Sequence, residues 1–336
     1  MTTDRADHAA EVETIDGEGL LGQVARLFFD RQLTKVEIAT RLGISRFRVA
    51  RLLDRALADG VVRIEFRDTP SQDRGLGREL AERFGIGRCV VAASDDIAAV
   101  ARLSAEVVDG LLEPGESIGI AWGSTVARVV RSMPAREDPS IEVVQLAGSS
   151  TTLDAAADPG DLTRVLAERL GARHHRIHAP AFVESAALRD ALLRQPELAA
   201  VVARFDGLDV ALLGIGAFGG GGAAPSSSLL RSGALGTKDA GELTRLGAVG
   251  DLLVHPFTID GRFVAPALAA RAIAISIDQL RAVPTVVAVA SGVAKVAAVR
   301  GALRTGVIGV LVTDATTARG VLADAPTAAA SRTSTR

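Results

Sequence analysis

The stretch Leu33–Arg55, LTKVEIATRLGISRFRVARLLDR, predicts two short helices joined by a tight turn. Thr34 is suited to cap the first helix because its hydroxyl can accept a hydrogen bond from a free backbone amide. The apolar positions of this helix are expected to form one buried stripe, made of Val36, Ile38, Ala39 and Leu42. Gly43 supplies the turn, since a residue without Cβ reverses the chain at little steric cost.

The second helix of this pair has two chemically different sides. Ser45 is suited to cap it, and its apolar positions recur at helical spacing: Val49, Leu52, Leu53, Ala56 and Leu57. The other side carries Phe47, Arg48, Arg51 and Arg55, with Arg46 in the first turn. A helix that is packed on one side and cationic on the other suits the major groove of DNA. The predicted partner is therefore a double-stranded DNA operator, with contacts from Thr34, Ser45, Arg46, Phe47, Arg48 and Arg51.

The charge distribution supports this interpretation. The 336-residue chain has a net charge of -2, yet residues 20–68 hold ten Lys/Arg against six Asp/Glu, a local balance of +4. This basic segment coincides with the two-helix motif, as attraction to phosphate requires. The alternative is that arginine is simply abundant in a chain with only three lysines.

Composition excludes several other classes of protein. Apolar residues make up 48% of the chain, enough for a large core, and no apolar run has the length of a membrane span. The acidic, polar N-terminus is unlike a secretion signal. A single cysteine, Cys89, excludes an internal disulfide framework and a cysteine-based zinc finger. We therefore expect a cytoplasmic protein without a membrane partner.

The chain is expected to divide into two domains between two tails. Residues 1–18 and 325–336 are predicted to be disordered, 19–68 to form a winged helix-turn-helix domain, and 69–324 to form the larger domain. A helix is predicted from about Leu20 to Arg31. The alternating segment Val61–Arg67 predicts the strand of the wing.

The larger domain alternates strands and helices. The predicted strands are Arg88–Ala92, Ser117–Ala121, Ile141–Leu146, Val210–Ile215, Thr285–Ala290 and Gly309–Thr313. The predicted helices are Gly75–Phe84, Ile97–Leu112, Thr125–Arg131, Leu162–Leu170, Ser185–Leu193, Glu242–Leu246, Lys295–Thr305 and Ala315–Ala323. Continuous Val/Ile/Leu strands interleaved with helices predict an α/β fold, a doubly wound and mostly parallel sheet covered on both faces.

Ligands of such sheets bind at the carboxyl ends of the strands, where the strand order reverses. Gly123, Ser124 and Thr125 follow one strand and open a helix, so their hydroxyls and amides can hold an anionic oxygen. Lys295, which follows another strand end, is a candidate phosphate ligand, and Asp251 is a candidate acceptor for sugar hydroxyls. The alternatives are an ordinary helix cap at Ser124, a solvated lysine and a capping aspartate. The glycine run Gly219–Gly222 is expected to be a flexible surface loop.

Other kinds of site find little support in the sequence. His174, His175 and His178 lie near a predicted edge segment, without other potential metal ligands beside them. Surface or structural roles are therefore expected for them. No Ser–His–Asp arrangement, GxGxxG fingerprint or Walker loop is present, and no cofactor or metal is expected.

Several motifs in order along the chain carry a resemblance to a known family. In the first domain they are Glu37–Ala39, Leu42–Arg46, Val49, Arg51–Leu53 and Gly60–Val62. In the second they are Gly119–Thr125, Gln145–Ser149, Gly214–Gly216, Ser232–Gly233, Gly247–Asp251, Asp260–Gly261, Ala290–Lys295 and Leu311–Asp314. Over about residues 20–323 the chain resembles the SorC/DeoR-type sugar-binding transcriptional regulators.

The resemblance implies a DNA-binding domain and an effector domain related to sugar-phosphate isomerases and deaminases, assembled as a homodimer or homotetramer. It also implies that Gly123, Ser124, Thr125, Asp251 and Lys295 hold a phosphorylated sugar effector. The predicted function is therefore an operator-binding regulator of carbohydrate metabolism genes, without enzyme activity. The alternatives are an active sugar-phosphate isomerase or deaminase, which needs an acid/base pair that the sequence does not offer beyond Asp251, and an architectural nucleic-acid protein without a ligand.

Overall fold

The computed structural model describes residues 19–31, 33–62, 71–150, 158–219, 225–231 and 235–323. The chain divides into two compact units, Met1–Asp68 and Thr69–Arg336. The two tails predicted to be disordered, residues 1–18 and 325–336, lie outside the described residues. Most of the predicted wing strand and of the glycine run lies outside them as well.

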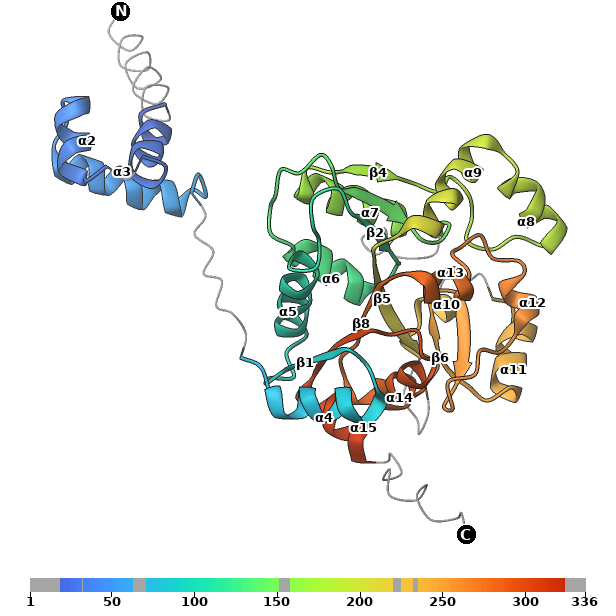
Figure 1. Cartoon of the computed structure of the whole chain (residues 1–336). Helices are drawn as coiled ribbons and strands as arrows, with labels where there is room; N and C mark the ends of the chain where they lie inside the picture. The colour runs from blue at the N-terminus through green and yellow to red at the C-terminus, as the bar shows by residue number, and fades with distance from the viewer. Residues whose placement is uncertain are drawn as a thin grey trace, which may run out of the picture. The chain divides into compact units, whose positions relative to one another are not determined.

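The first unit is a small helical bundle (Figure 1). Residues 19–29 form a helix, followed by α2 (Lys35–Leu42) and α3 (Arg46–Ala58). Their shared core consists of Val24, Ile38, Val49 and Leu53, all at most 4% exposed. Gly43 ends α2 with φ +65°, a conformation that favours glycine, so the turn forms as predicted. Val61 and Val62 form a bend after α3.

Two predicted core positions of this unit are wrong. Val36 is 60% exposed and Leu57 is 39% exposed, although both were expected in the buried stripes. Val36 is the second residue of α2 and Leu57 the penultimate residue of α3. A bundle of three short helices has too few neighbours to cover the ends of its apolar stripes, so helical periodicity overestimates burial there.

The second unit is a three-layer α/β structure with a central sheet, which confirms the predicted fold class (Figure 1). The strands are β1 (Arg88–Ala92), β2 (Ser117–Ile120), β3 (Glu142–Gln145), β4 (Arg173–His175), β5 (Val210–Ala217), β6 (Ala248–Leu252), β7 (His255–Thr258), β8 (Thr285–Val289) and β9 (Val310–Asp314). All six predicted strands are present. Their order is β1-β9-β8-β5-β2-β3-β4, and all neighbours in this order pair in parallel.

Helices cover both faces of this sheet. They are α4 (Arg74–Phe84), α5 (Ile97–Asp109), α6 (Ser124–Ser132), α7 (Pro159–Leu170), α8 (Ala186–Leu193), α9 (Pro196–Val202), η2 (Ala203–Gly207), α10 (Ser228–Arg231), α11 (Thr237–Arg245), α12 (Pro266–Ala269), α13 (Ile277–Ala282), η3 (Val293–Lys295), α14 (Val296–Arg304) and α15 (Ala315–Ala323). One apolar core joins α5, α6 and α7 to one face, and another joins α4, α14 and α15 to the opposite face. Alternate residues of β1, β3, β5, β8 and β9 enter the two cores, as a sheet buried on both sides requires.

The hairpin of β6 and β7 was not predicted. It runs antiparallel to the carboxyl end of β5, with Gly216 paired to Asp251 in register. The hairpin contains Gly250 and Pro256. Because glycine and proline are poor strand formers, residue propensities do not predict strands there. None of the described helices is both long and apolar enough to cross a lipid bilayer.

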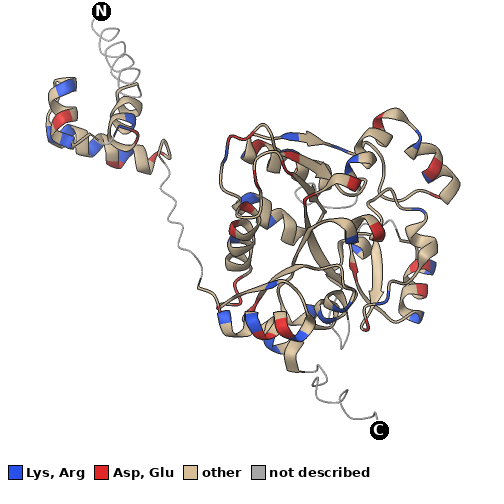
Figure 2. Cartoon of the chain, in the orientation of Figure 1, with Lys and Arg blue, Asp and Glu red and all other residues tan. Residues whose placement is uncertain are grey.

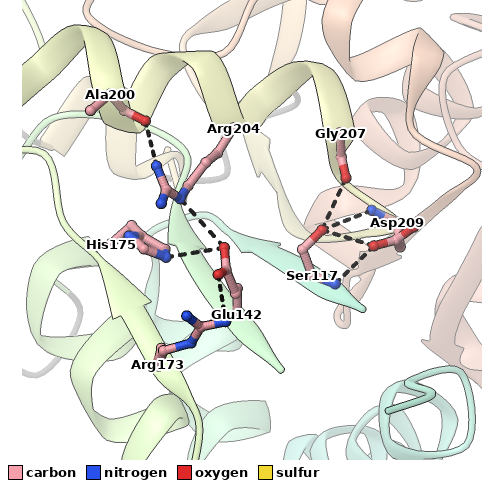
Figure 3. A network of polar contacts seen from close by, with 8 residues as sticks. All are labelled: Ser117, Glu142, Arg173, His175, Ala200, Arg204, Gly207 and Asp209. Atoms are coloured by element: carbon pink, nitrogen blue, oxygen red, sulfur yellow. Dashed lines mark hydrogen bonds and ion pairs between the residues drawn. The ribbon is translucent and has the colours of Figure 1, made fainter. Parts of the chain in front are cut away.

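The outer edge of the sheet is held by a carboxylate that contacts two arginines and a histidine (Figure 3). Glu142 at the start of β3 accepts from Arg173 Nη2 at 2.9 Å and lies 3.1 Å from His175 Nε2, both on edge strand β4. Arg204 Nε in η2 lies 3.4 Å from the same carboxylate. These contacts fasten β4 and η2 to the sheet, which is the structural role expected for His175.

Candidate functional site

The helix α3 presents its polar side to solvent. Ser45 caps it by accepting the Arg48 backbone amide at 3.2 Å. Val49, Leu53 and Ala56 are buried, whereas Arg46, Phe47, Arg48, Arg51 and Arg55 are all exposed. The predicted division of this helix into a packed and a cationic side is therefore confirmed.

The positive charges on α3 are only partly compensated (Figure 2). Arg55 pairs with Asp59 at 3.1 Å one turn later. Arg48 and Arg51 make no ion pair with any residue that the structure describes. The Arg46 guanidinium lies over the Phe47 ring, 4.9 Å from its centroid. Uncompensated arginines on one exposed face create a positive potential, which attracts the phosphate backbone of DNA.

Thr34 is engaged at the start of α2. Its hydroxyl accepts the Glu37 amide at 3.3 Å and donates to the Glu37 carboxylate, which in turn accepts the Thr34 amide at 2.8 Å. This capping box sets where α2 begins. The hydrogen bonds from Thr34 lower the pKa of Glu37.

A polar pocket opens at the carboxyl ends of β2 and β5 in the second unit. Beyond β2 the sheet continues through β3 and β4 on one side, and through β5, β8 and β9 on the other. The strand order reverses between β2 and β5, which is where doubly wound sheets bind ligands. The pocket contains about 370 Å³ of empty space, with open solvent at its mouth included, and its walls hold Gly123, Ser124, Thr125, Asp251 and Lys295.

The start of α6 forms the first wall of this pocket. Gly123 has φ +121°, a conformation closed to other residues, and directs the chain from β2 into α6. No side chain among the described residues caps this helix, so its first amides can meet a ligand. The hydroxyls of Ser124 and Thr125 stand at the same end. Free amides and hydroxyls at a helix N-terminus favour an anion.

Lys295 forms the second wall. It lies at the end of η3, and its ammonium donates to the backbone carbonyl of Ile215 in β5 at 2.9 Å. Burial lowers its pKa, an effect opposed by the negative charge of Asp251 and reinforced by the positive charge of Arg231. A partly buried ammonium that donates to one carbonyl retains two further donors for a ligand.

Asp251 faces Lys295 from the hairpin. It is 3% exposed, and its Oδ1 accepts a 2.5 Å hydrogen bond from Ser227 Oγ. Burial raises the pKa of Asp251 to about 7, against the opposing effects of the Ser227 hydrogen bond and the Lys295 charge. Gly216, its partner across the hairpin, leaves the space that the carboxylate occupies, since a Cβ there would collide with it.

Three further pocket residues were not singled out from the sequence. Ser226 and Ser228 line the pocket, and Ser226 Oγ is buried without a hydrogen-bond partner among the residues that the structure describes. Trp122, 4% exposed, lies beside them. The run of three serines at 226–228 could have indicated polar pocket residues from the sequence. The glycine run before it instead favoured a surface loop. A buried orphan hydroxyl at a pocket is a group that a polar ligand can satisfy.

The turn that leads to Lys295 is fastened by Asp314 at the end of β9. The Gly292 amide donates to Asp314 Oδ2 at 2.8 Å and to Thr317 Oγ1 at 2.9 Å. Thr317 also donates to Asp314 through its amide and its hydroxyl. Although burial raises the pKa of Asp314, these hydrogen bonds outweigh it and the net shift is downward. Asp314 therefore holds the 291–295 segment in place as a carboxylate.

All five residues predicted for the effector site thus line one pocket, and the six predicted for DNA lie on α3 or at the start of the helix pair. Among the described residues, no group of three His, Cys, Asp or Glu side chains is arranged to hold a metal ion.

Known proteins resemble this chain over nearly its whole length. Residues 68–323 match the Sugar-bind family, described as "Putative sugar-binding domain". The sorbitol operon regulator of Klebsiella pneumoniae is 30% identical over 93% of this chain and 100% of its own length. The erythritol catabolism regulatory protein EryD of Brucella abortus is 29% identical over 91% of this chain and 96% of its own.

A solved structure agrees with these relatives. The crystal structure of the full-length sorbitol operon regulator SorC from Klebsiella pneumoniae has a TM-score of 0.68 and 29% identity, covering 91% of this chain and 99% of that protein. These relatives are named as regulators, which does not favour the alternative of an active isomerase or deaminase. The chain belongs to the SorC/DeoR-type family of sugar-binding transcriptional regulators.

Proposed function

We propose that this regulator binds a phosphorylated sugar in the pocket between β2 and β5, and that the bound sugar changes its affinity for an operator. The phosphate lies at the N-terminus of α6, on the hydroxyls of Ser124 and Thr125, with Lys295 as its cationic partner. Asp251 and Ser226 hydrogen-bond the sugar hydroxyls. The observation that carries this proposal is the start of α6, uncapped by any described side chain, in one pocket with a partly buried Lys295 and a buried Asp251.

We propose that α3 enters the major groove of the operator. Arg46, Phe47 and Arg48 reach base edges or flanking phosphates, because the first residues of a recognition helix lie deepest in the groove. Arg51 contacts the backbone, and Thr34 and Ser45 place the two helix N-termini near phosphates. The names of the relatives, which regulate sorbitol and erythritol genes, support a carbohydrate operon as the target.

Binding of a sugar can act on DNA affinity only if it favours one state of the protein over another. We propose a homodimer or homotetramer in which the effector selects one quaternary arrangement, in keeping with the family resemblance. An operator on the chromosome places this regulator in the cytoplasm. Phosphorylation of the sugar fits the same compartment, since phosphate esters are charged and are made inside cells.

Trp122 offers a direct test of the pocket. The chain has one tryptophan and no tyrosine, so its emission reports the wall of the pocket alone. Phosphorylated sugars and polyols, with their unphosphorylated parents, are titrated against this emission. The proposal expects a saturable change with a phosphorylated compound only. Saturation with the parent sugar at equal concentration would contradict the assignment of the phosphate site.

Lys295→Ala then links the pocket to the operator. This variant should bind DNA as the unchanged protein does but no longer respond to the sugar phosphate identified with Trp122. The control is Lys238→Ala, which removes an exposed lysine elsewhere in the same unit. An unaltered response of Lys295→Ala at the same ligand concentration would show that the pocket is misplaced.

A further inference from the structure

Phe47 is an exposed aromatic residue at a position where the core does not need it. It is 68% exposed and is the only exposed phenylalanine among those that the structure describes. The chain uses aromatic residues sparingly, at 3% of its composition, and packs the other described phenylalanines at least in part. A ring that remains exposed to water adds little to the stability of the fold. A function of this side chain is therefore to be sought in binding.

The ring has a defined place on the recognition helix. Phe47 is the second residue of α3, directly after Arg46, and lies on the same face as Arg51 one turn later. The Arg46 guanidinium covers one face of the ring at 4.9 Å. The residue as a whole nevertheless stays 68% exposed. A cation–π contact of this kind holds the ring beside the N-terminus of the helix.

The major groove offers one common apolar group to such a ring. Of the four bases only thymine carries a methyl group there, at C5, and the remaining groove edges are hydrogen-bond donors and acceptors. A phenyl ring cannot hydrogen-bond those edges. It discriminates between bases by removing a methyl group from water, a contribution that depends on apolar area alone.

We propose that Phe47 reads the C5-methyl group of a thymine in each operator half-site. This inference rests on the proposed docking of α3 in the major groove and names one element of the sequence that the docked helix selects. The arginines on either side of Phe47 bind phosphates or guanines, so the methyl contact adds base preference without adding charge. Its effect on affinity is therefore independent of salt concentration.

The experiment removes the methyl group from the DNA and the ring from the protein. Duplexes that the full chain enriches from a random library are resynthesised with deoxyuridine in place of each thymidine, one position at a time. The affinity of the unchanged protein should fall about fourfold at one thymine per half-site, as expected for a buried methyl-sized group. Phe47→Ala should bind the thymine and uracil duplexes equally.

A matched control comes from the same helix. Leu57→Ala removes another exposed apolar side chain, ten residues further along α3 and about 15 Å from the N-terminal end. This variant should distinguish thymine from uracil as the unchanged protein does. Both altered residues are exposed, so both variants should fold.

The possible failures are distinguishable. If the unchanged protein enriches no sequence, the docking of α3 is wrong and the inference falls with it. If it binds its selected duplex tightly but no uracil position lowers the affinity, DNA binding stands and the role of Phe47 is wrong. The role is also wrong if Phe47→Ala keeps the preference for thymine.

Discussion

Ser227 joins the start of α10 to the carboxylate of Asp251, 24 residues later in the chain. Its Oγ donates to Asp251 Oδ1 at 2.5 Å and accepts the Leu230 amide at 3.3 Å. The same hydroxyl therefore caps a short helix and satisfies a buried acid at the pocket. The hairpin of β6 and β7 is thereby connected to the segment that carries Ser226 and Ser228.

Ser227→Ala should destabilise the second unit by about 1 to 3 kcal/mol, because a buried carboxyl group loses its hydrogen-bond donor. The measurement is urea unfolding followed through Trp122, which reports this unit alone. Ser226→Ala is the matched control, since the neighbouring hydroxyl makes no hydrogen bond with any described residue. Equal losses in the two variants would show that the Ser227 contact contributes nothing of its own.

The raised pKa of Asp251 predicts a dependence of stability on pH. With a folded pKa of about 7 against an ordinary value of 3.8, the folded protein keeps a proton that the unfolded chain has lost. Stability from this group is full below about pH 4 and falls as pH rises to about 7, by at most about 1.4 kcal/mol per pH unit. Above pH 7 both states are ionised and the loss is complete.

Asp251→Asn removes this titration. The stability of this variant relative to the unchanged protein should increase across the interval from about pH 4 to pH 7 and stay constant above it. Urea unfolding at several pH values, followed through Trp122, gives this difference directly. A difference that is flat across the interval would mean that Asp251 is ionised throughout, held by Lys295 despite its burial.

Asp314 should act on the effector through Lys295. Asp314→Asn replaces an acceptor of three backbone and hydroxyl donors with an amide, which weakens the anchoring of Gly292 and the turn before Lys295. We expect about tenfold weaker sugar-phosphate binding, as positioning groups around a site commonly provide. Affinity for DNA without effector should be unchanged. A variant that loses both would point to general unfolding. The control is Thr316→Ala, two residues further along the chain in α15, whose hydroxyl donates to Asp95 rather than to Asp314.

Much of this architecture follows from local patterns. The parallel strands were predicted because each is a short apolar run bounded by polar or glycine residues, as β8 and β9 show. The ends of the predicted strands then brought Ser124, Thr125 and Lys295 to one edge of the sheet. This prediction required no knowledge of side-chain contacts, because the carboxyl ends of parallel strands all lie at the same edge of the sheet.

The rest depended on contacts between distant segments. Asp251 was predicted as an acceptor for sugar hydroxyls or a capping residue, with no strand assigned to it. It lies within β6, whose pairing with β5 requires Gly216 opposite the carboxylate. The Ser227 hydroxyl finds Asp251 only once α10 and the hairpin are assembled. The exposure of Val36 and Leu57 likewise depends on which neighbours reach the helix ends, and periodicity carries no information on that.

Glu142→Gln should lower the pKa of His175. Burial lowers that pKa first, and the Arg204 charge lowers it further, whereas the Glu142 carboxylate raises it (Figure 3). Removing the carboxylate leaves the lowering effects of burial and of the Arg204 and Arg173 charges unopposed. An NMR titration of the His175 ring measures the change, with Glu197→Gln on nearby α9 as control. No change in the titration would mean that the contacts drawn around Glu142 are screened in solution.

The same variant should lose little stability. Arg173 and Arg204 are 65% and 38% exposed, so their pairs with Glu142 contribute about 1 kcal/mol at most. The loss should shrink as salt is added, because exposed charges are screened. A loss that is large and independent of salt would indicate that Glu142 is needed for packing of edge strand β4.

Arg48→Ala tests the docking of α3 most directly. Arg48 is exposed and makes no ion pair with a described residue, so its removal costs the fold little while removing one positive charge from the proposed DNA surface. If Arg48 contacts a phosphate, affinity should fall for every duplex, and the slope of log affinity against log salt should decrease by about 0.9. If it contacts a base edge, affinity should fall about tenfold or more for the selected sequence alone.

The control is Arg245→Ala, an arginine of 73% side-chain exposure in the second unit, which should leave both quantities unchanged. An Arg48→Ala protein with the affinity and salt slope of the unchanged chain would contradict the docking. Arg48 lies in the first turn of α3, and the first residues of a recognition helix are those that contact the DNA.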